Sequence, residues 1–258
     1  MLTMTTRKLP LVLLLMIVIV STVSFLPIQE AKATPDIVFS DSEDGYVTGT
    51  GLVGNGLSSM LVGDSFGDIS DHMFVRFSLS SVWGNLTSAK LYLYLFRSRT
   101  GGIPYETSPL PNIGLGDCQV IHIADYGTLD GSDFSAPSIG NDPGVLIGSS
   151  ATPDVGFVSI DVKAAMEDDM RSGRSFTAFM LKMSTATDND QDQDTWHFRT
   201  YENNDQSQRP YIDYTSDKRP VGGVVVSTNK LEIVAPFAAL AGLIAAVSAV
   251  VLVKKRRD

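Results

Sequence analysis

The stretch "HMFVRFSLSSVWGNLTSAKLYLYLF", residues 72–96, decides the fold. Apolar residues alternate through both of its halves, and alternation is the period of a β-strand. In the second half aliphatic and aromatic side chains take opposite parities: Leu91, Leu93 and Leu95 against Tyr92, Tyr94 and Phe96. Because successive side chains of a strand point to opposite faces, this half predicts a strand with one aliphatic and one aromatic face.

The two halves of this stretch, 73–79 and 90–97, are expected to pair as a β-hairpin. Parity then directs one set of side chains toward a second sheet, namely Met73, Val75, Phe77 and Leu79 with the three leucines. The opposite face would carry His72, Phe74, Arg76 and Ser78 beside Lys90, Tyr92, Tyr94 and Phe96. Such a face suits a sugar, because pyranose C–H groups lie on aromatic rings while cationic side chains reach hydroxyls or carboxylates. The alternative is ordinary cross-strand packing, or a loop such as 98–116 that covers the rings.

Other alternating runs, bounded by Gly, Asp, Asn, Ser and Pro, indicate further strands. The expected strands are 36–40, 45–47, 59–62, 119–124, 155–162, 175–183, 195–201 and 211–214. One helix is expected at 161–173, with Asp161 as its N-cap and Gly173 as its stop. The region 127–154 is expected to run over the surface. These patterns predict an all-β sandwich with one short helix.

The two ends of the chain predict its topology. Arg7 and Lys8 precede an apolar run and an Ala31-Lys32-Ala33 site, which is typical of a cleaved secretory signal peptide. An uncleaved signal anchor is the alternative. The uncharged segment 233–253 would form a helix of about 32 Å, enough to cross a bilayer, and four cations follow it directly. The expected organisation is 1–33 signal peptide, 34–215 sandwich domain, 216–232 tether, 233–253 transmembrane helix and 254–258 cytoplasmic tail.

Charge and cysteine content limit the functions of the exterior part. Residues 34–230 hold 13 Lys or Arg and 26 Asp or Glu, a formal charge of −13. This balance argues against nucleic acid, whose recognition needs basic patches. The chain has one cysteine, Cys118, so no internal disulfide can stabilise the domain. Together with the signal peptide and the membrane-spanning segment expected at the two ends, these features predict a cell-membrane protein with a single span and its domain outside the cell.

Five segments resemble, in order, the family 96 carbohydrate-binding modules, also called DNRLRE-type domains. They are "DGYVTG" (44–49), "MLVGDS" (60–65), "FVRFSLSSVWGNLTSAKLYLYLF" (74–96), "GFVSIDVKAAMEDDMRSG" (156–173) and "FRTYENNDQSQRPYIDYT" (198–215). The resemblance implies a jelly-roll-like β-sandwich that binds polysaccharide. Ser78 departs from the family, which has an acidic residue there, and 98–116 is a long insertion. The C-terminal arrangement resembles membrane-anchored surface proteins of archaea.

The candidate carbohydrate-binding residues come from two strands and one later run. They are Phe74, Arg76, Tyr92 and Tyr94, with Arg199 and Tyr201 from "DTWHFRTYE". Two acidic stretches, 40–45 and 188–194, offer the oxygen ligands that Ca²⁺ prefers. Asp41 and Asp44 are the candidate ligands of a structural Ca²⁺, whereas 188–194 lacks the glycine and glutamate of an EF-hand loop and reads as a solvated run.

No spacing typical of a catalytic motif occurs in the sequence. The predicted function is therefore non-catalytic binding of a polysaccharide at the cell surface. One alternative is a structural or adhesive envelope protein that binds another protein. A polysaccharide-cleaving enzyme is a further alternative, because sequence does not show how far apart two carboxylates lie.

Overall fold

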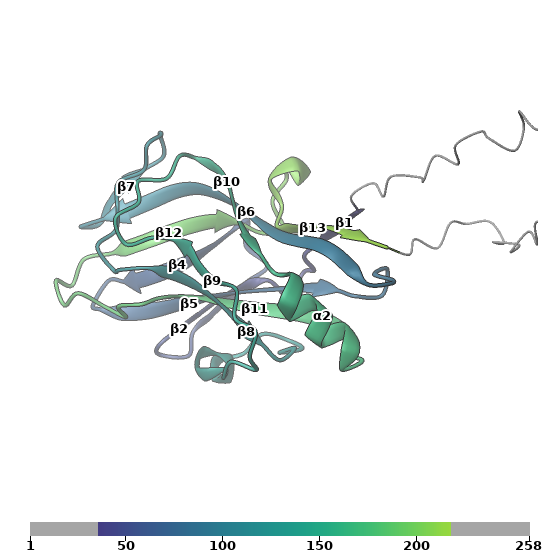
Figure 1. The fold of residues 1–258 in the computed structure, drawn as a ribbon. Coiled ribbons are helices and arrows are strands. Elements are labelled where there is room, and N and C mark those ends of the chain that lie inside the picture. The colour runs from purple at the N-terminus through teal and green to yellow at the C-terminus, as the bar shows by residue number, and fades with distance from the viewer. Residues whose placement is uncertain (1–35, 218–258) are drawn as a thin grey trace, which may run out of the picture. The chain divides into compact units, whose positions relative to one another are not determined.

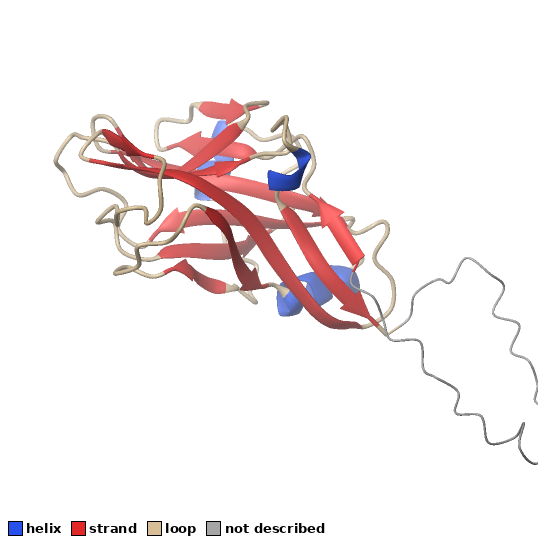
Figure 2. Ribbon diagram, turned by 90° about the horizontal axis from the view of Figure 1, so that it is seen from above, coloured by secondary structure: helices blue, strands red, loops and turns tan. Residues whose placement is uncertain are grey.

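Strands make up nearly half of residues 36–217, which are the residues that the computed structural model describes (Figure 2). The strands are β1 (Asp36–Phe39), β2 (Gly45–Thr48), β3 (Val53–Asn55), β4 (Ser59–Ser65), β5 (Ile69–Ser78), β6 (Leu86–Thr100), β7 (Ile103–Tyr105), β8 (Cys118–Ile123), β9 (Gly144–Ile147), β10 (Gly156–Asp161), β11 (Phe176–Met183), β12 (Asp194–Arg199) and β13 (Tyr211–Ser216). The helices are η1 (Gly131–Ser135), α2 (Lys163–Arg171) and η2 (Gln206–Gln208). The predicted all-β class is confirmed.

The strands form one antiparallel sheet that curls until its two halves face each other (Figure 1). Its main path runs β1-β13-β6-β12-β4-β5-β11-β8-β9, while β10 and β7 pair with β6, and β2 pairs with β3 and β5. The first half, around β6, and the second half, around β5, supply side chains to the same buried core. The result is sandwich-like, with β12 and β4 connecting the two halves.

The predicted hairpin between 73–79 and 90–97 is wrong. Strand β5 pairs with β11, β4 and β2, whereas β6 pairs with β10, β13, β12 and β7. The predicted inward parity is nevertheless right, because Met73, Val75 and Phe77 are buried in the same core as Leu91, Leu93 and Leu95. Alternation determines which side chains enter the core but not which strand lies alongside. The outward residues of β5 and β6 therefore lie on opposite outer faces.

The expected helix occurs as α2, which contacts both β6 and β11. It buries Ala165 and Met166 against the core. The Asp161 carboxylate accepts the Lys163 backbone N–H at 2.9 Å, although the residue at the N-cap position is Val162. Gly173 follows the helix with φ +68°, a left-handed conformation that glycine adopts without steric cost. Because α2 contacts β6 of one half of the sheet and β11 of the other, it covers the core that the two halves share.

A second, smaller core lies on the outer side of β2, β5, β11 and β8. It contains Val47, Phe74, Ile123, Leu129, Ala178 and Met180, with Tyr126 and Phe134 packed against it. Residues 124–139, which include η1, therefore cover this outer face. The region 127–154 was expected to run over the surface. Its first part belongs to this covering segment, and its later part contains the unpredicted strand β9.

The predicted signal peptide at 1–33, the span at 233–253 and the tail at 254–258 lie outside the described residues, as does the tether beyond residue 217. Between residues 36 and 217, no helix combines the length and the apolar content that a membrane crossing requires.

Candidate functional site

Five aromatic residues form a row across four neighbouring strands on the outer face of the β6 half. Phe39 of β1 lies directly opposite Tyr211 of β13, and Tyr211 lies opposite Tyr92 of β6. On the other side of β6, Phe157 of β10 lies opposite Tyr94. We call these five residues the aromatic row. Their order follows from strand register, because side chains of one parity on paired strands share a face.

The rings of the aromatic row are in mutual contact. Tyr92 and Tyr211 stack with centroids 4.8 Å apart and an interplanar angle of 10°. Phe157 stands edge-on to Tyr94 at 5.1 Å and to Tyr211 at 5.3 Å, and Phe39 lies 6.2 Å from Tyr211. Such pairs contribute about 0.5–1.5 kcal/mol beyond burial, so the rings hold one another in place.

The aromatic row remains accessible to solvent. Phe39 is 48% exposed and Phe157 39% exposed, while the three tyrosines are half-buried. In the part of the chain that the structure describes, no hydrogen bond engages the hydroxyls of Tyr92, Tyr94 or Tyr211. Burial, and then the neighbouring Tyr92, raise the pKa of Tyr211, so its hydroxyl stays protonated and can donate a hydrogen bond at neutral pH. The row thus offers ring faces together with free donors.

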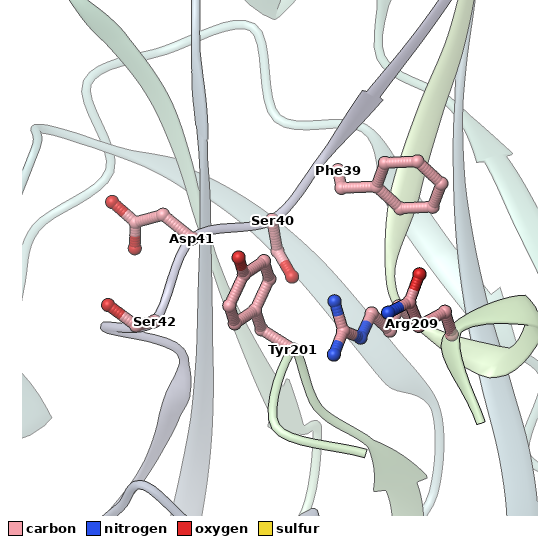
Figure 3. A pocket seen from close by; sticks show the side chains of 7 residues that line it. Phe39, Ser40, Asp41, Ser42, Tyr201 and Arg209 are labelled. Carbon is pink, nitrogen blue, oxygen red and sulfur yellow. The ribbon is translucent and has the colours of Figure 1, made fainter. Parts of the chain in front are cut away.

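A pocket of about 420 Å³ adjoins the aromatic row at Phe39 (Figure 3). Its other lining residues are Ser40, Asp41, Ser42, Tyr201, Gln206 and Arg209. The Arg209 guanidinium lies over the Tyr201 ring, 4.6 Å from its centroid. The pocket therefore combines an aromatic wall with a cation, a carboxylate and hydroxyl groups.

Asp44, which is buried, holds the backbone of the pocket residue Tyr201. Its Oδ2 accepts the Tyr201 backbone N–H at 2.9 Å and the Ser40 hydroxyl at 2.9 Å. Burial raises the pKa of this carboxyl well above its ordinary value, although the Tyr201 N–H opposes the shift. Asp44 thus joins the β1–β2 connection to the segment after β12, and both line the pocket.

The predicted metal ligands, Asp41 and Asp44, have different partners. Asp41 accepts a hydrogen bond at 2.8 Å from Nε of Arg76, while Asp44 is buried with the contacts given above. Among residues 36–217, the acidic side chains that gather in groups of three or more lie elsewhere, at Asp64, Asp68, Asp188, Asp190 and Asp194. Calcium binding by Asp41 and Asp44 stays a prediction.

Phe74 and Arg76 do not lie on the aromatic row. Phe74 is fully buried and meets Tyr126 edge-on, under the segment 124–139. The Arg76 side chain is 12% exposed, because it forms ion pairs with Asp41 and Asp125. The face expected to hold a sugar is therefore split in two, and its β5 part serves packing instead.

Four of the predicted residues do lie along the β6 half. Tyr92 and Tyr94 belong to the aromatic row, and Tyr201 lines the pocket. The Arg199 guanidinium carbon is 3.7 Å from the ring centroid of Phe96, two residues beyond Tyr94 on β6. Sequence reasoning missed Phe39, Phe157 and Tyr211. Each has the outward parity of its strand, but only the register shows that they meet.

No family model matches this sequence, and no curated protein is significantly similar to it.

Proposed function

We propose that this protein binds a polysaccharide without cleaving it, through the aromatic row and the adjoining pocket. The domain would be a jelly-roll-like β-sandwich related to the family 96 carbohydrate-binding modules. It would be secreted through its signal peptide and held at the outside of the cell membrane by the helix at 233–253. The resemblance of the five sequence segments supports this assignment, and the aromatic row supports it independently.

The observation that carries the proposal is the placement of rings on four adjacent strands. With about 4.8 Å between strands, three strand intervals extend for about 14 Å, enough for more than one sugar ring. Ring faces would stack on pyranose C–H groups, and free tyrosine hydroxyls would bond sugar hydroxyls. The pocket would take a sugar at one end of the chain, where Arg209 and Asp41 offer a donor and an acceptor.

An adhesive function is the second candidate. Aromatic residues are enriched at protein interfaces, and β1, at the end of the main strand path, exposes Ile37 at 55% beside Phe39. Such an edge could receive another protein of the cell envelope. Sugar binding and adhesion would use the same surface, so only identification of the bound ligand, a glycan or a protein, can distinguish the two functions.

A glycan array probed with the full chain in mild detergent tests the proposal. We expect retention on a defined class of polysaccharide, weakened about tenfold or more in Tyr92→Ala and Tyr211→Ala, which is a loss of about 1.4 kcal/mol. Trp83→Ala is the matched control, because Trp83 is a 56% exposed aromatic outside the row. Its binding should match the wild type.

Stability measurements keep the result interpretable. Tyr92→Ala removes ring contacts with Tyr211 and Phe157, so it should cost about 1–3 kcal/mol, or about 2–12 °C in Tm. Tyr211→Ala removes three ring contacts and should cost somewhat more. Binding to no glycan, with retention of an envelope protein through the same residues, would instead establish the adhesive function. Release of reducing sugar would show that the protein is an enzyme.

A further inference from the structure

Five aspartates from four segments converge at the connection between β4 and β5. Asp64 belongs to β4, Asp68 to the β4–β5 turn, Asp188 and Asp190 to the β11–β12 loop, and Asp194 to β12. Carboxylate oxygens of Asp64, Asp68 and Asp188 all lie within 4.8 Å of one another. The same holds for Asp188, Asp190 and Asp194, so Asp188 is common to both groups. We call the five residues the acidic cluster.

An exposed acidic loop needs no ligand, but Asp64 is not exposed. Its exposure is 0%, and its Oδ1 accepts the Asp194 backbone N–H at 3.0 Å. Its Oδ2 is buried without a hydrogen-bond partner. A buried carboxylate oxygen is unfavourable unless a hydrogen bond or a cation compensates it. Asp64 thus indicates a missing positive partner, independently of the clustering itself.

The protein itself does not supply that partner. Among the described residues, no lysine or arginine forms an ion pair with any member of the acidic cluster. The donors are all carboxylate oxygens, without histidine or cysteine, so the set is suited to a hard cation rather than to zinc or copper. Most of them come from a turn and a loop, an irregular arrangement that suits Ca²⁺ better than the strict octahedron of Mg²⁺.

We propose that the acidic cluster is a Ca²⁺ site centred on Asp188. The ion would complete the coordination of the buried Asp64 and join the β4–β5 turn to the β11–β12 loop. The two segments already touch, because Asp68 Oδ1 accepts the Gln191 N–H at 3.0 Å. Asp194 extends the connection to the turn after β6, since its Oδ1 accepts the Gly101 N–H at 2.9 Å. In a domain without a disulfide, such an ion would act as a cross-link. This proposal does not depend on sugar binding.

Thermal unfolding of the full chain in mild detergent, with EGTA or with added CaCl₂, tests the site. At about a hundredfold excess over Kd, Ca²⁺ should raise Tm by about 5 °C or more. MgCl₂ at the same concentration should raise it less. Isothermal titration calorimetry with CaCl₂ should show the binding heat directly.

Two variants and a control distinguish the loss of Ca²⁺ coordination from a loss of stability that is unrelated to Ca²⁺. Asp188→Asn should weaken Ca²⁺ binding at least tenfold and remove the Ca²⁺-dependent rise in Tm. Asp64→Asn should remove that rise too, while its Tm in EGTA stays at or above that of the wild type, because an uncompensated buried charge is gone. Asp192→Asn changes an exposed residue of the same loop outside both groups and should respond to Ca²⁺ as the wild type does.

The proposal is overturned if Ca²⁺ changes neither Tm nor the heat signal of the wild type. It is also overturned if Asp188→Asn and Asp192→Asn respond to Ca²⁺ equally.

Discussion

His122 illustrates how a single buried residue depends on contacts that the sequence hides. It is fully buried on β8, where Nδ1 lies 2.7 Å from the Gly140 carbonyl and Nε2 lies 3.0 Å from Asp169 Oδ2. Both neighbours are acceptors, so the ring must donate from both nitrogens and carry a positive charge. Asp169 in turn accepts from Arg174 at 2.6 Å. The resulting network fixes the end of α2 to β8.

The charge on His122 predicts a pH-dependent stability. Burial lowers the pKa of this imidazole, but the hydrogen bonds to Asp169 and Gly140 outweigh burial, so the net pKa is raised. A group whose pKa is raised by folding stabilises the folded protein. This stabilisation is fully present when the pH is below the ordinary pKa of about 6.5, and it is lost as the pH rises through the folded-state pKa. His122→Gln should therefore cost more free energy of unfolding at pH 6 than at pH 9. At pH 6 the loss should be about 1.5–3 kcal/mol, the contribution of a hydrogen bond to a charged group.

Urea unfolding of wild type and His122→Gln at the two pH values measures this difference. An NMR titration of the ring would confirm that His122 is the titrating group. An equal loss of stability at both pH values would show that the positive charge of His122 does not contribute to the stability of the folded protein.

At the scale of elements, Arg76 joins β5 to the segment that covers it. Its guanidinium forms ion pairs with Asp41 at 2.8 Å and Asp125 at 2.9 Å. It also lies 4.5 Å from the ring centroid of Phe176 and 5.6 Å from that of Tyr126. One side chain thus holds the β1–β2 connection, β11 and the start of the 124–139 cover together.

Arg76→Ala should lower the free energy of unfolding by about 1–3 kcal/mol, because it removes charge-assisted hydrogen bonds to two partly exposed carboxylates, Asp41 and Asp125, together with the ring contacts. Chemical denaturation measures the loss. Arg171→Ala is the control, because this side chain is 74% exposed and its polar contacts stay within its own helix: a 3.8 Å contact to Asp168 and a hydrogen bond from Nε to the Glu167 carbonyl at 3.2 Å. The stability of this variant should differ from that of the wild type by less than about 0.5 kcal/mol. Similar stabilities for both variants would show that the ion pairs of Arg76 contribute nothing.

Strand positions and inward faces could be predicted from the sequence, but pairing could not. Alternation in 73–79 and 90–97 correctly selected core residues such as Phe77 and Leu93. Besides β4 and β2, strand β5 pairs with β11, about a hundred residues later, and nothing local to either strand encodes that choice. The three unpredicted strands, β3, β7 and β9, have only three or four residues each, too few for a clear alternation.

For the candidate site too, the outward direction of single side chains could be predicted from the sequence, but their neighbours on other strands could not. Tyr92 and Tyr94 carry a clear outward parity, so they were found. Phe39 and Tyr211 join them only through the β1–β13–β6 register, which depends on the whole fold. Phe74 has the same kind of pattern as Tyr94, yet the segment 124–139 covers it. Parity separates inside from outside for one sheet but does not show whether a second layer covers the outside.

At the scale of the whole molecule, stability depends on one core shared by both halves of the curled sheet. Cys118 of β8 is buried in that core, against β11 and β9. It is the single cysteine of the chain. Burial raises the pKa of its thiol to about 12, so the reactive thiolate is scarce in the folded protein. The thiol is therefore a reporter for opening of the core.

Cys118 should resist alkylation by iodoacetamide in the native protein and react rapidly in denaturant, as mass spectrometry would show. The attacking thiolate can form only when β8 separates from its neighbours, so the native reaction should be slowed by the unfolding equilibrium, about 10³-fold or more. Because the core joins both halves, Arg76→Ala should accelerate the reaction in proportion to its loss of stability, whereas Arg171→Ala should not. If β8 instead opens by itself at the edge beside the short β9, the two variants will react at the same rate, and the shared core would not be a single cooperative unit.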